Sequence, residues 1–505
     1  ISYHGSSSSP YASNIIPKNL SEIIEKIGEN NSVVLSLFLN PYSLNSFEKI
    51  DHFDSIIVGY QNNMISQEVM ADLMTGTRSF KGKLPVSNNF YPVNHGISID
   101  KKNILGYSRP VYEGFDQKKL SYLDSIAISA IDSMMAPGIQ MLVSKKGKIV
   151  YNKSFGYHTY KKLNKLENDH VFDLSSITKI LATMPLVIQE YETGNLSLNT
   201  KLNELFPKRK LADKGDITLK EMLSHFARLR PWIPFYEETL NRKEKPKSRF
   251  YKTNSRSSFS TPVSENLYLK KNYKDKIFKS IVESELIEKL EFKYSDLPFY
   301  FLKFWFEDIY NKPLDLLAEE RIFNKLQLER TMFNPYKKLK LDEIVPTEED
   351  DFFRYSKLHG YVHDEGAAML GGVSGHAGLF SNSYEVAVIL QAMIQGGLYN
   401  NHRLFKSESF DVFNTCYFCE YDNRSGVGFD KPQIEGNHGS TFGGVSMNSF
   451  GHYGYTGSMA WADPDEEIIF VFLSNRTFPT RENTLLQKSN IRTRSQEIVY
   501  KSIID

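Results

Sequence analysis

The stretch VFDLSSITK, residues 171–179, contains a Ser-x-x-Lys pair formed by Ser176 and Lys179. If a helix opens at Ser176, the two side chains lie three residues apart on one helix face, where they can meet. A serine hydroxyl is a weak nucleophile, and a neighbouring lysine with a depressed pKa can accept its proton. The helix N-terminus also places positive potential and N–H groups beside a developing oxyanion. The stretch predicts a nucleophilic serine, although an exposed helical Ser and Lys give the same spacing.

The Ser-x-x-Lys spacing alone does not identify the nucleophile, because the chain contains a second such pair. Ser46-Phe47-Glu48-Lys49 matches the spacing equally well, but it lies between expected elements of an N-terminal α/β region, and we assign it no role. Residues 180–191, by contrast, continue from Ser176 as a largely apolar helix pattern. The chain therefore carries Ser176 into a helix suited to burial.

Two further elements follow Ser176 along the chain. Tyr294-Ser295-Asp296 precedes a second apolar helix pattern, and Gly451-His452-Tyr453-Gly454 precedes strand-like sequence near the C-terminus. Each has a structural explanation when taken alone, Tyr294 as a core-edge tyrosine and His452 as a strand histidine. Their order after the serine–lysine pair favours one common site.

This order resembles that of penicillin-binding proteins, class C β-lactamases and related carboxylesterases, whose three boxes are Ser-x-x-Lys, Tyr-x-Asn and Lys-Thr-Gly. The segment GGVSGHAGLFS, residues 371–381, is also similar to a segment of that superfamily, and the resemblance spans residues 116–505. Asp296 stands where the family has Asn, and His452 stands where it has Lys. A third departure is Arg228, which occupies a position where Gly is usual.

The resemblance implies a serine-type acyl hydrolase with Ser176, Lys179 and Tyr294 as catalytic residues. In the expected mechanism Lys179 accepts the proton of Ser176, and Tyr294 passes a proton to the leaving group, its pKa lowered by adjacent positive charge. The N–H of Ser176 and one from the strand after His452 form the oxyanion hole. The implied substrate-binding residues, of which His452 orients substrate or supplies positive charge, are Asp296, His452, Gly454 and Thr456.

Neither a cofactor nor a metal is expected, and His363 and His376 are interpreted as structural because no metal-ligand spacing joins them. The substrate class stays open between acyl esters, D-Ala-D-Ala peptides and β-lactams, with small-molecule or peptidoglycan-derived substrates as the partners. One alternative is a non-catalytic binding or scaffold module attached to a cell-wall N-acetylglucosaminidase. A second is a glycosidase whose C-terminal module is inert.

Strand patterns at both ends of residues 116–505 predict an α+β fold. Residues 138–144 and 148–153 form a hairpin pattern, and two more strands are expected at 458–463 and 467–473. Helical patterns occur at 118–133, and they dominate 173–230 and 296–330. We expect an antiparallel sheet closed by its first and last strands, with an inserted helical subdomain.

The first 95 residues predict an α/β region. Apolar runs at 32–39 and 55–60 are typical of buried parallel strands, and a helix is expected at 66–74 with Ser66 as its candidate N-cap. Gly59-Tyr60-Gln61-Asn62 and Gly82-Lys83-Leu84-Pro85-Val86-Ser87 resemble the C-terminal sandwich of family 3 glycoside hydrolases.

The resulting domain prediction is a partial α/β sandwich domain at 1–95, a linker at 96–115 and a β-lactamase-like domain at 116–505. The chain begins Ile1-Ser2-Tyr3, so we expect a piece of a longer polypeptide whose N-terminal glycosidase barrel is missing. The resemblance implies a fusion with a β-N-acetylglucosaminidase and a periplasmic or cell-envelope location in a bacterium.

The composition of this 505-residue chain limits the classes of partner that it is expected to bind. Its formal net charge of +1 suggests no nucleic-acid partner, and no apolar run is long enough to span a membrane. The only two cysteines, Cys416 and Cys419, are interpreted as small hydrophobes or as one local disulfide. Residues 241–256 carry seven Lys and Arg against Glu244, which fits either a solvated loop or a surface that recognises an anionic substrate or polymer.

Overall fold

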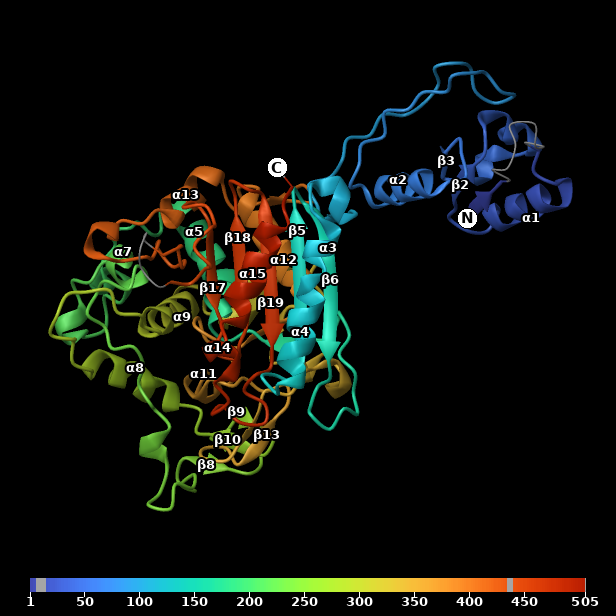
Figure 1. Cartoon of the computed structure of the whole chain (residues 1–505). Helices are drawn as coiled ribbons and strands as arrows, with labels where there is room; N and C mark the ends of the chain where they lie inside the picture. Colours follow the sequence, from blue (N-terminus) through green and yellow to red (C-terminus); the bar gives the residue numbers. More distant parts are fainter. Residues whose placement is uncertain (6–14, 434–438, 505) are drawn as a thin grey trace. The chain divides into compact units, whose positions relative to one another are not determined.

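The computed structural model describes residues 1–5, 15–433 and 439–504. The chain divides into two compact units, Ile1–Tyr107 and Ser108–Asp505, which are coloured from blue to red in Figure 1. The division falls inside the segment 96–115 that the sequence marks as a connector.

The first unit contains a parallel sheet in the order β1-β2-β3, which confirms the parallel strands expected there. Its elements are β1 (Ser2–His4), α1 (Lys18–Gly28), β2 (Val34–Phe38), β3 (Ser55–Val58) and α2 (Met64–Thr75). The expected N-cap of α2 was wrong. Asn63 caps the helix, because its side-chain oxygen accepts the N–H of Ser66, and Ser66 therefore lies inside the first turn.

An antiparallel sheet organises the second unit, with its strands in the order β17-β18-β19-β5-β6. The strands are β5 (Gly138–Lys145), β6 (Lys148–Gly156), β17 (Phe450–Tyr453), β18 (Met459–Asp463) and β19 (Ile468–Ser474). β5 pairs with β19 along its length, with Val143 opposite Phe470. Strands from the two ends of the sequence thus close the sheet, as predicted.

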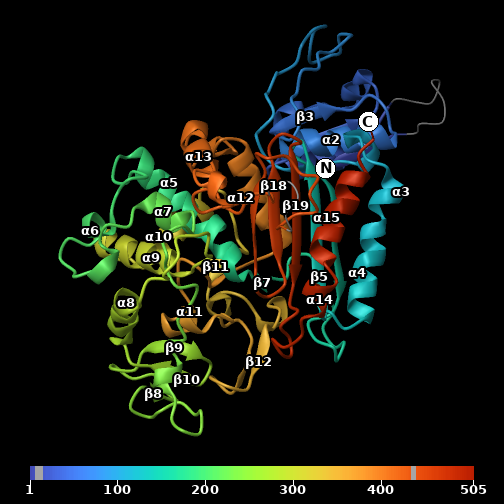
Figure 2. The same cartoon turned by 60° about the vertical axis from the view of Figure 1, so that its left-hand side comes forward.

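Helices cover both faces of this sheet (Figure 2). On one face α4 (Tyr122–Asp132) and α15 (Ile491–Lys501) bury a core with alternate residues of the central strands, including Trp461 and Phe470. On the other face α12 (Ser383–Ile394) packs against β5, β18 and β19. Each strand therefore presents apolar side chains in both directions.

The single helix expected at 118–133 is two helices, α3 (Gln117–Leu120) and α4. The break falls at Ser121, whose hydroxyl donates to the carbonyl of Lys118 and so competes with helical hydrogen bonding.

The helical subdomain follows β7 (Phe172–Asp173) and lies beside the sheet (Figure 2). Its helices are α5 (Met184–Glu192), α6 (Leu202–Leu205), α7 (Leu219–Leu223), α8 (Tyr273–Glu283), α9 (Leu297–Tyr310) and α10 (Leu314–Ala318). A small sheet in the order β8-β10-β9 is inserted before α8, from β8 (Tyr251–Lys252), β9 (Thr261–Ser264) and β10 (Leu267–Leu269).

Short elements complete the second unit. They are β11 (Met332–Phe333), β12 (Glu348–Asp350), β13 (Ser356–Leu358), α11 (Glu365–Met369), β14 (Leu379–Ser381), β15 (Leu398–Tyr399), β16 (His402–Arg403), α13 (Ser407–Asn414) and α14 (Leu485–Lys488). Cys416 and Cys419 form a local disulfide, one of the two interpretations that their spacing allowed. None of the helices in the described ranges has the length and apolarity that crossing a membrane requires.

Candidate active site

A sharp turn after β7 presents Ser176. Ser175 has a φ of 48°, a left-handed conformation that is uncommon for residues other than glycine. Two side chains hold the turn: the Asp173 carboxylate accepts the Ser175 N–H at 2.8 Å, and Thr178 Oγ1 donates to the Ser175 carbonyl at 2.6 Å. Backbone strain of this kind persists only where surrounding contacts enforce it, and it concentrates at functional sites.

The helix expected from Ser176 onward is not a regular α-helix. A 3-10 turn at Ser175–Ile177 is followed by a π-helix at Lys179–Thr183, and α5 begins at Met184. π-helical turns inside helices are frequent at functional sites. Ser176 and Lys179 still meet, since Lys179 Nζ lies 2.8 Å from Ser176 Oγ.

Lys179 is fully buried and its ammonium group meets three acceptors. These are Ser176 Oγ at 2.8 Å, Asp296 Oδ1 at 2.7 Å and the carbonyl oxygen of His376 at 3.1 Å. An ammonium group has three N–H donors, so the three acceptors match a charged lysine.

Tyr294 completes the group around the nucleophile. Its hydroxyl oxygen lies 3.1 Å from Ser176 Oγ and 3.2 Å from Asp296 Oδ1. Burial raises the pKa of Tyr294 well above its ordinary value, and the negative charge of Asp296 raises it further. The expectation of a lowered Tyr294 pKa was therefore wrong, because burial and the neighbouring Asp296 carboxylate both disfavour the phenolate.

Asp296 immediately precedes α9, yet its side chain does not cap that helix. Its Oδ1 atom instead accepts from Lys179 and from Tyr294. The sequence predicted a substrate-binding role for Asp296, whereas the structure brings its carboxylate to the lysine and tyrosine that flank the nucleophile.

His452 lies on β17 with a defined arrangement of ring hydrogens. Its Nδ1 atom lies 2.7 Å from the Tyr453 carbonyl, and because a carbonyl only accepts, Nδ1 carries the hydrogen. The buried Nε2 atom has no hydrogen-bond partner among the described residues. Burial lowers the pKa of His452, so at neutral pH the ring is uncharged and Nε2 is an acceptor. Of the two roles expected of His452, supplying positive charge is therefore wrong, whereas orienting the substrate stays a prediction.

Gly454 and Thr456, also predicted to bind substrate, support the nucleophile turn. Thr456 Oγ1 donates its hydrogen to the Asp173 carbonyl at 2.8 Å, so only its lone pairs are left for a substrate. A Cβ at Gly454 would lie 2.7 Å from the carbonyl oxygen of Leu174, and this close approach requires glycine.

His225 was not singled out as a site residue from the sequence, but the structure places it against the tyrosine. Its ring centroid lies 4.7 Å from that of Tyr294, and its Nδ1 accepts the N–H of Ser295 at 3.2 Å. Burial lowers the pKa of His225 to about 3, which keeps the ring neutral. His225 thus positions the loop that carries Tyr294 and Asp296.

Arg228, three residues after His225, has a left-handed backbone conformation with a φ of 58°, a conformation that favours glycine. Its backbone carbonyl accepts the N–H of Ile287 at 2.7 Å, and its Nε donates to the Ile287 carbonyl. The arginine at this position therefore contacts the loop at Ile287 through both its backbone and its side chain.

We expect Arg228→Gly to change the free energy of unfolding by less than about 1 kcal/mol, because relief of left-handed strain offsets the lost side-chain hydrogen bond. Esterase kcat/KM should stay within about twofold of the unmodified protein, which steady-state assays and denaturant unfolding measure. A large loss of kcat/KM at unchanged stability would place the guanidinium in the site instead.

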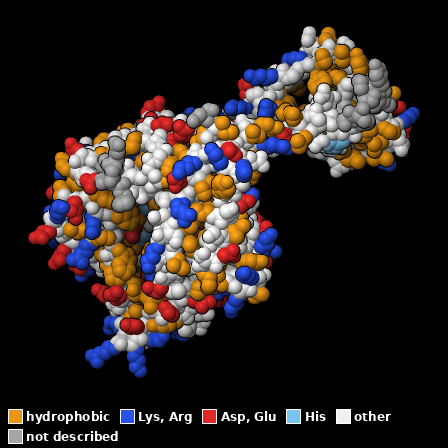
Figure 3. Space-filling view, viewed as in Figure 1, with side chains coloured by type: hydrophobic (Ala, Val, Ile, Leu, Met, Phe, Trp, Pro, Cys, Tyr) orange, Lys and Arg blue, Asp and Glu red, His pale blue; other side chains and the backbone are white. Residues whose placement is uncertain are grey.

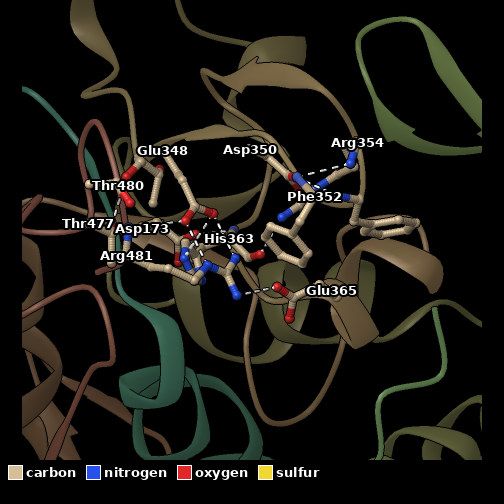
Figure 4. A network of polar contacts seen from close by, with 12 residues as sticks. Asp173, Glu348, Asp350, Phe352, Arg354, His363, Glu365, Thr477, Thr480 and Arg481 are labelled. Atoms are coloured by element: carbon tan, nitrogen blue, oxygen red, sulfur yellow. Dashed lines mark hydrogen bonds and ion pairs between the residues drawn. The ribbon is translucent and has the colours of Figure 1, made fainter. Parts of the chain in front are cut away.

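A second polar network supports Asp173 from the other side (Figure 4). The Asp173 carboxylate accepts the N–H of His363 at 2.6 Å, and the His363 ring lies 3.2 Å from Glu348. Arg481 donates to both oxygens of Glu348 at 2.7 Å and pairs with Glu365 at 2.6 Å. The ring of His376 bonds to Asp364 and Ser374, both at 2.8 Å. Both histidines are thus structural in these contacts, as expected.

Replacing Arg481 by methionine should lower the free energy of unfolding by about 3–5 kcal/mol, because it leaves buried carboxylates without their cation. Burial alone would raise the pKa of Glu348, but hydrogen bonds from Arg481 and His363 hold it well below its usual range. A lowered carboxyl pKa stabilises the fold above its ordinary value of 4.5, and this contribution is lost on acidification below that value.

Urea unfolding at neutral and acidic pH measures both effects. The matched control is Arg230→Met, which removes an exposed pair with Glu285 and should cost less than about 1 kcal/mol. Equal losses in the two variants would contradict a structural role for the Arg481 network.

Comparison with known proteins identifies the family and the fold. Residues 127–489 match the family model described as Beta-lactamase. A Salmonella agona (strain SL483) protein named "Putative D-alanyl-D-alanine carboxypeptidase" is 31% identical over 399 residues, covering 74% of this chain and 86% of that protein. Two solved structures share the fold. EstCE1, described as a hydrolase with promiscuous acyltransferase activity, superposes with a TM-score of 0.54 at 17% identity, covering 77% of this chain and 100% of EstCE1. A penicillin-binding protein homologue from Caulobacter crescentus gives 0.53 at 16% identity, covering 77% and 99%.

Proposed function

This chain belongs to the beta-lactamase family and is a serine hydrolase of that family, and we propose that Ser176 is its nucleophile. The observation that carries the proposal is the convergence on Ser176 Oγ of Lys179 Nζ at 2.8 Å and the Tyr294 hydroxyl at 3.1 Å. Such a nucleophile attacks an ester or amide carbonyl, forms an acyl-enzyme and releases the acyl group to water.

We assign the role of final proton acceptor to Asp296. Lys179 already donates to three acceptors, so as an ammonium group it has no lone pair for the serine proton. Tyr294 has a raised pKa and acts as a phenol, which can accept a proton only as it gives up its own. A route through either residue ends at Asp296 Oδ1, which contacts both.

In the acylation step, Ser176 Oγ forms a bond to the substrate carbonyl carbon and its proton moves through Tyr294 to Asp296. The Lys179 ammonium stabilises the charge that develops on Oγ. When the tetrahedral intermediate collapses, the bond to the leaving group breaks and the proton returns from Asp296 through Tyr294 to that group. Water then repeats the sequence on the acyl-enzyme.

The oxyanion hole is assigned to the N–H groups of Ser176 and Tyr455. Ser176 lies in the first turn of its 3-10 helix, where N–H groups have no intrahelical acceptor. Tyr455 follows Gly454, whose own N–H is used by the Ser458 carbonyl at 2.9 Å.

We further propose that the substrate is a peptidoglycan-derived peptide. Nε2 of His452 is a buried acceptor without a partner among the described residues, and a peptide N–H would satisfy it. The name of the Salmonella relative supports the same substrate class. A bacterial cell-envelope location forms part of this proposal.

Release of D-Ala from an acyl-D-Ala-D-Ala peptide, compared with hydrolysis of a p-nitrophenyl ester, tests the substrate class. We expect the peptide to have the higher kcat/KM. Turnover of the ester alone would contradict the peptide assignment while leaving the serine chemistry intact.

We propose that the first unit is part of an α/β sandwich domain of the family 3 glycoside hydrolase type. Its partner in the same polypeptide would be an N-acetylglucosaminidase barrel. The support is the parallel order β1-β2-β3 together with the Gly82-to-Ser87 motif. The proposal expects no hexosaminidase activity from this chain, and turnover of a chromogenic N-acetylglucosaminide would contradict it.

A further inference from the structure

A strongly basic surface, which we call the basic face, lies on the small sheet and on α8. Residues 242–279 contain twelve Lys and Arg against three acidic residues, Glu244, Glu265 and Asp275, whereas the whole chain has a net charge of only +1. The remaining sequence is therefore net acidic, and the positive charge is concentrated in this one segment.

Most of these cations face solvent. The exposed members are Arg242, Lys243, Lys245, Arg249, Arg256, Lys270, Lys271, Lys274, Lys276 and Lys279. Figure 3 shows basic side chains at the tip of this region, the lowest part of the larger unit in that view. Lys279 pairs with Glu283 at 3.5 Å, but the other nine form no ion pair with an acidic side chain in the described ranges.

Uncompensated charge of one sign costs stability, because exposed like charges within about 10 Å repel one another at moderate salt. The aromatic rings beside the basic face offset little of this charge, although Lys245 lies 3.0 Å from the Tyr355 ring centroid and Lys276 5.3 Å from that of Phe250. A surface of this kind maintains a positive potential that attracts polyanions.

We propose that the basic face binds an anionic polysaccharide. Single-stranded nucleic acid is bound through aromatic platforms on which its bases stack, and binding by insertion into a membrane needs apolar side chains. Binding to anionic lipid by charge alone is distinguished by the test below. The described residues between Trp232 and Leu290 expose no large hydrophobic side chain. Phe250 and Phe259 are partly covered, and Tyr251 and Tyr273 are buried. Apart from Tyr355, which is 37% exposed and lies against Lys245, the face offers mainly charge, which suits a polymer recognised through its carboxylate or sulfate groups.

The basic face is separate from the proposed catalytic residues. None of the hydrogen bonds and ion pairs of Ser176, Lys179, Tyr294 and Asp296 among the described residues involves residues 242–279. A bound polysaccharide would hold the enzyme on a charged matrix while the active site works on a separate substrate. The two functions can therefore be tested independently.

Binding of the full chain to fluorescent heparin, used as a sulfated polysaccharide probe, tests the proposal at 50 and 200 mM NaCl. The test variant combines Arg242→Gln, Lys243→Gln, Lys271→Gln and Lys274→Gln. The matched control removes four exposed lysines elsewhere, with Lys118→Gln, Lys119→Gln, Lys161→Gln and Lys208→Gln. We expect the test variant to lose affinity by about tenfold or more and to show a weaker salt dependence. The control should stay within about twofold, and ester hydrolysis should be unchanged in both.

Absence of heparin binding by the unmodified chain at 50 mM NaCl would overturn the proposal. So would equal losses in the two variants. Tighter binding to double-stranded DNA, or to vesicles of anionic phospholipid, would replace the polysaccharide with that partner.

Discussion

Replacing Ser176 by alanine is expected to abolish turnover, with a fall in kcat of up to about 10⁶-fold, as nucleophile removal does in serine hydrolases. The alanine lacks the oxygen that forms the acyl bond, while Lys179, Tyr294 and Asp296 keep their contacts with one another. Steady-state hydrolysis of a p-nitrophenyl ester measures the loss, and thermal unfolding shows that the variant is folded.

The chain provides its own matched control in Ser46, the serine of the second Ser-x-x-Lys. Ser46 Oγ accepts the N–H of Ile16 at 3.0 Å in the first unit. Ser46→Ala removes the same atom from the same sequence motif, so kcat should remain within about twofold. Loss of activity in Ser46→Ala, or its survival in Ser176→Ala, would contradict the assignment.

Replacing Asp296 by asparagine is expected to lower kcat/KM at neutral pH by about 10²–10⁴-fold, the usual contribution of a proton-transferring group. Asparagine preserves the size and the carbonyl oxygen of the side chain but cannot accept the serine proton. In the variant, Lys179 has lost its counter-ion and must become neutral to serve as the base. Residual activity should therefore rise with pH, which a pH profile of kcat/KM reveals.

Family resemblance suggests the opposite outcome for this variant, since asparagine is the residue of the second box. If Asp296 only replaces that asparagine in binding substrate, Asp296→Asn should keep or raise activity at neutral pH with an unchanged pH profile. Asp296→Ala distinguishes the two roles, because it removes the carboxylate without supplying an amide, and thermal unfolding shows that both variants are folded. A fully active asparagine variant would exclude Asp296 as the proton acceptor.

Local sequence signals predicted the scaffold well. The β-rich runs on either side of Gly147, which has a φ of 72°, became β5 and β6, because a hairpin depends on residues close in sequence. The pairing of β5 with β19 was predicted because both are apolar strand patterns, and each requires a neighbouring strand in the sheet. The contact between Tyr294 and Ser176 was predicted from the order of the three family motifs along the chain.

The protonation pattern of the site depends on contacts that no spacing in the sequence specifies. Asp296 meets Lys179 because the turn before α9 carries it there. Burial of Tyr294, with the Asp296 carboxylate beside it, reverses the expected pKa shift of the phenol. The hydrogen on His452 Nδ1 is fixed by the adjacent Tyr453 carbonyl, a matter of strand geometry. The left-handed conformation of Arg228 could likewise not be predicted, because residues other than glycine adopt it only rarely.

Trapping the acyl-enzyme tests the central claim most directly. The full chain is mixed with an activated ester, quenched in acid during the first turnovers, digested and mapped by mass spectrometry. The account predicts one acyl group, carried by Ser176 on the peptide that also contains Lys179, and no such adduct in Ser176→Ala. An acyl group on another residue, or hydrolysis without any trapped adduct on Ser176, would contradict it.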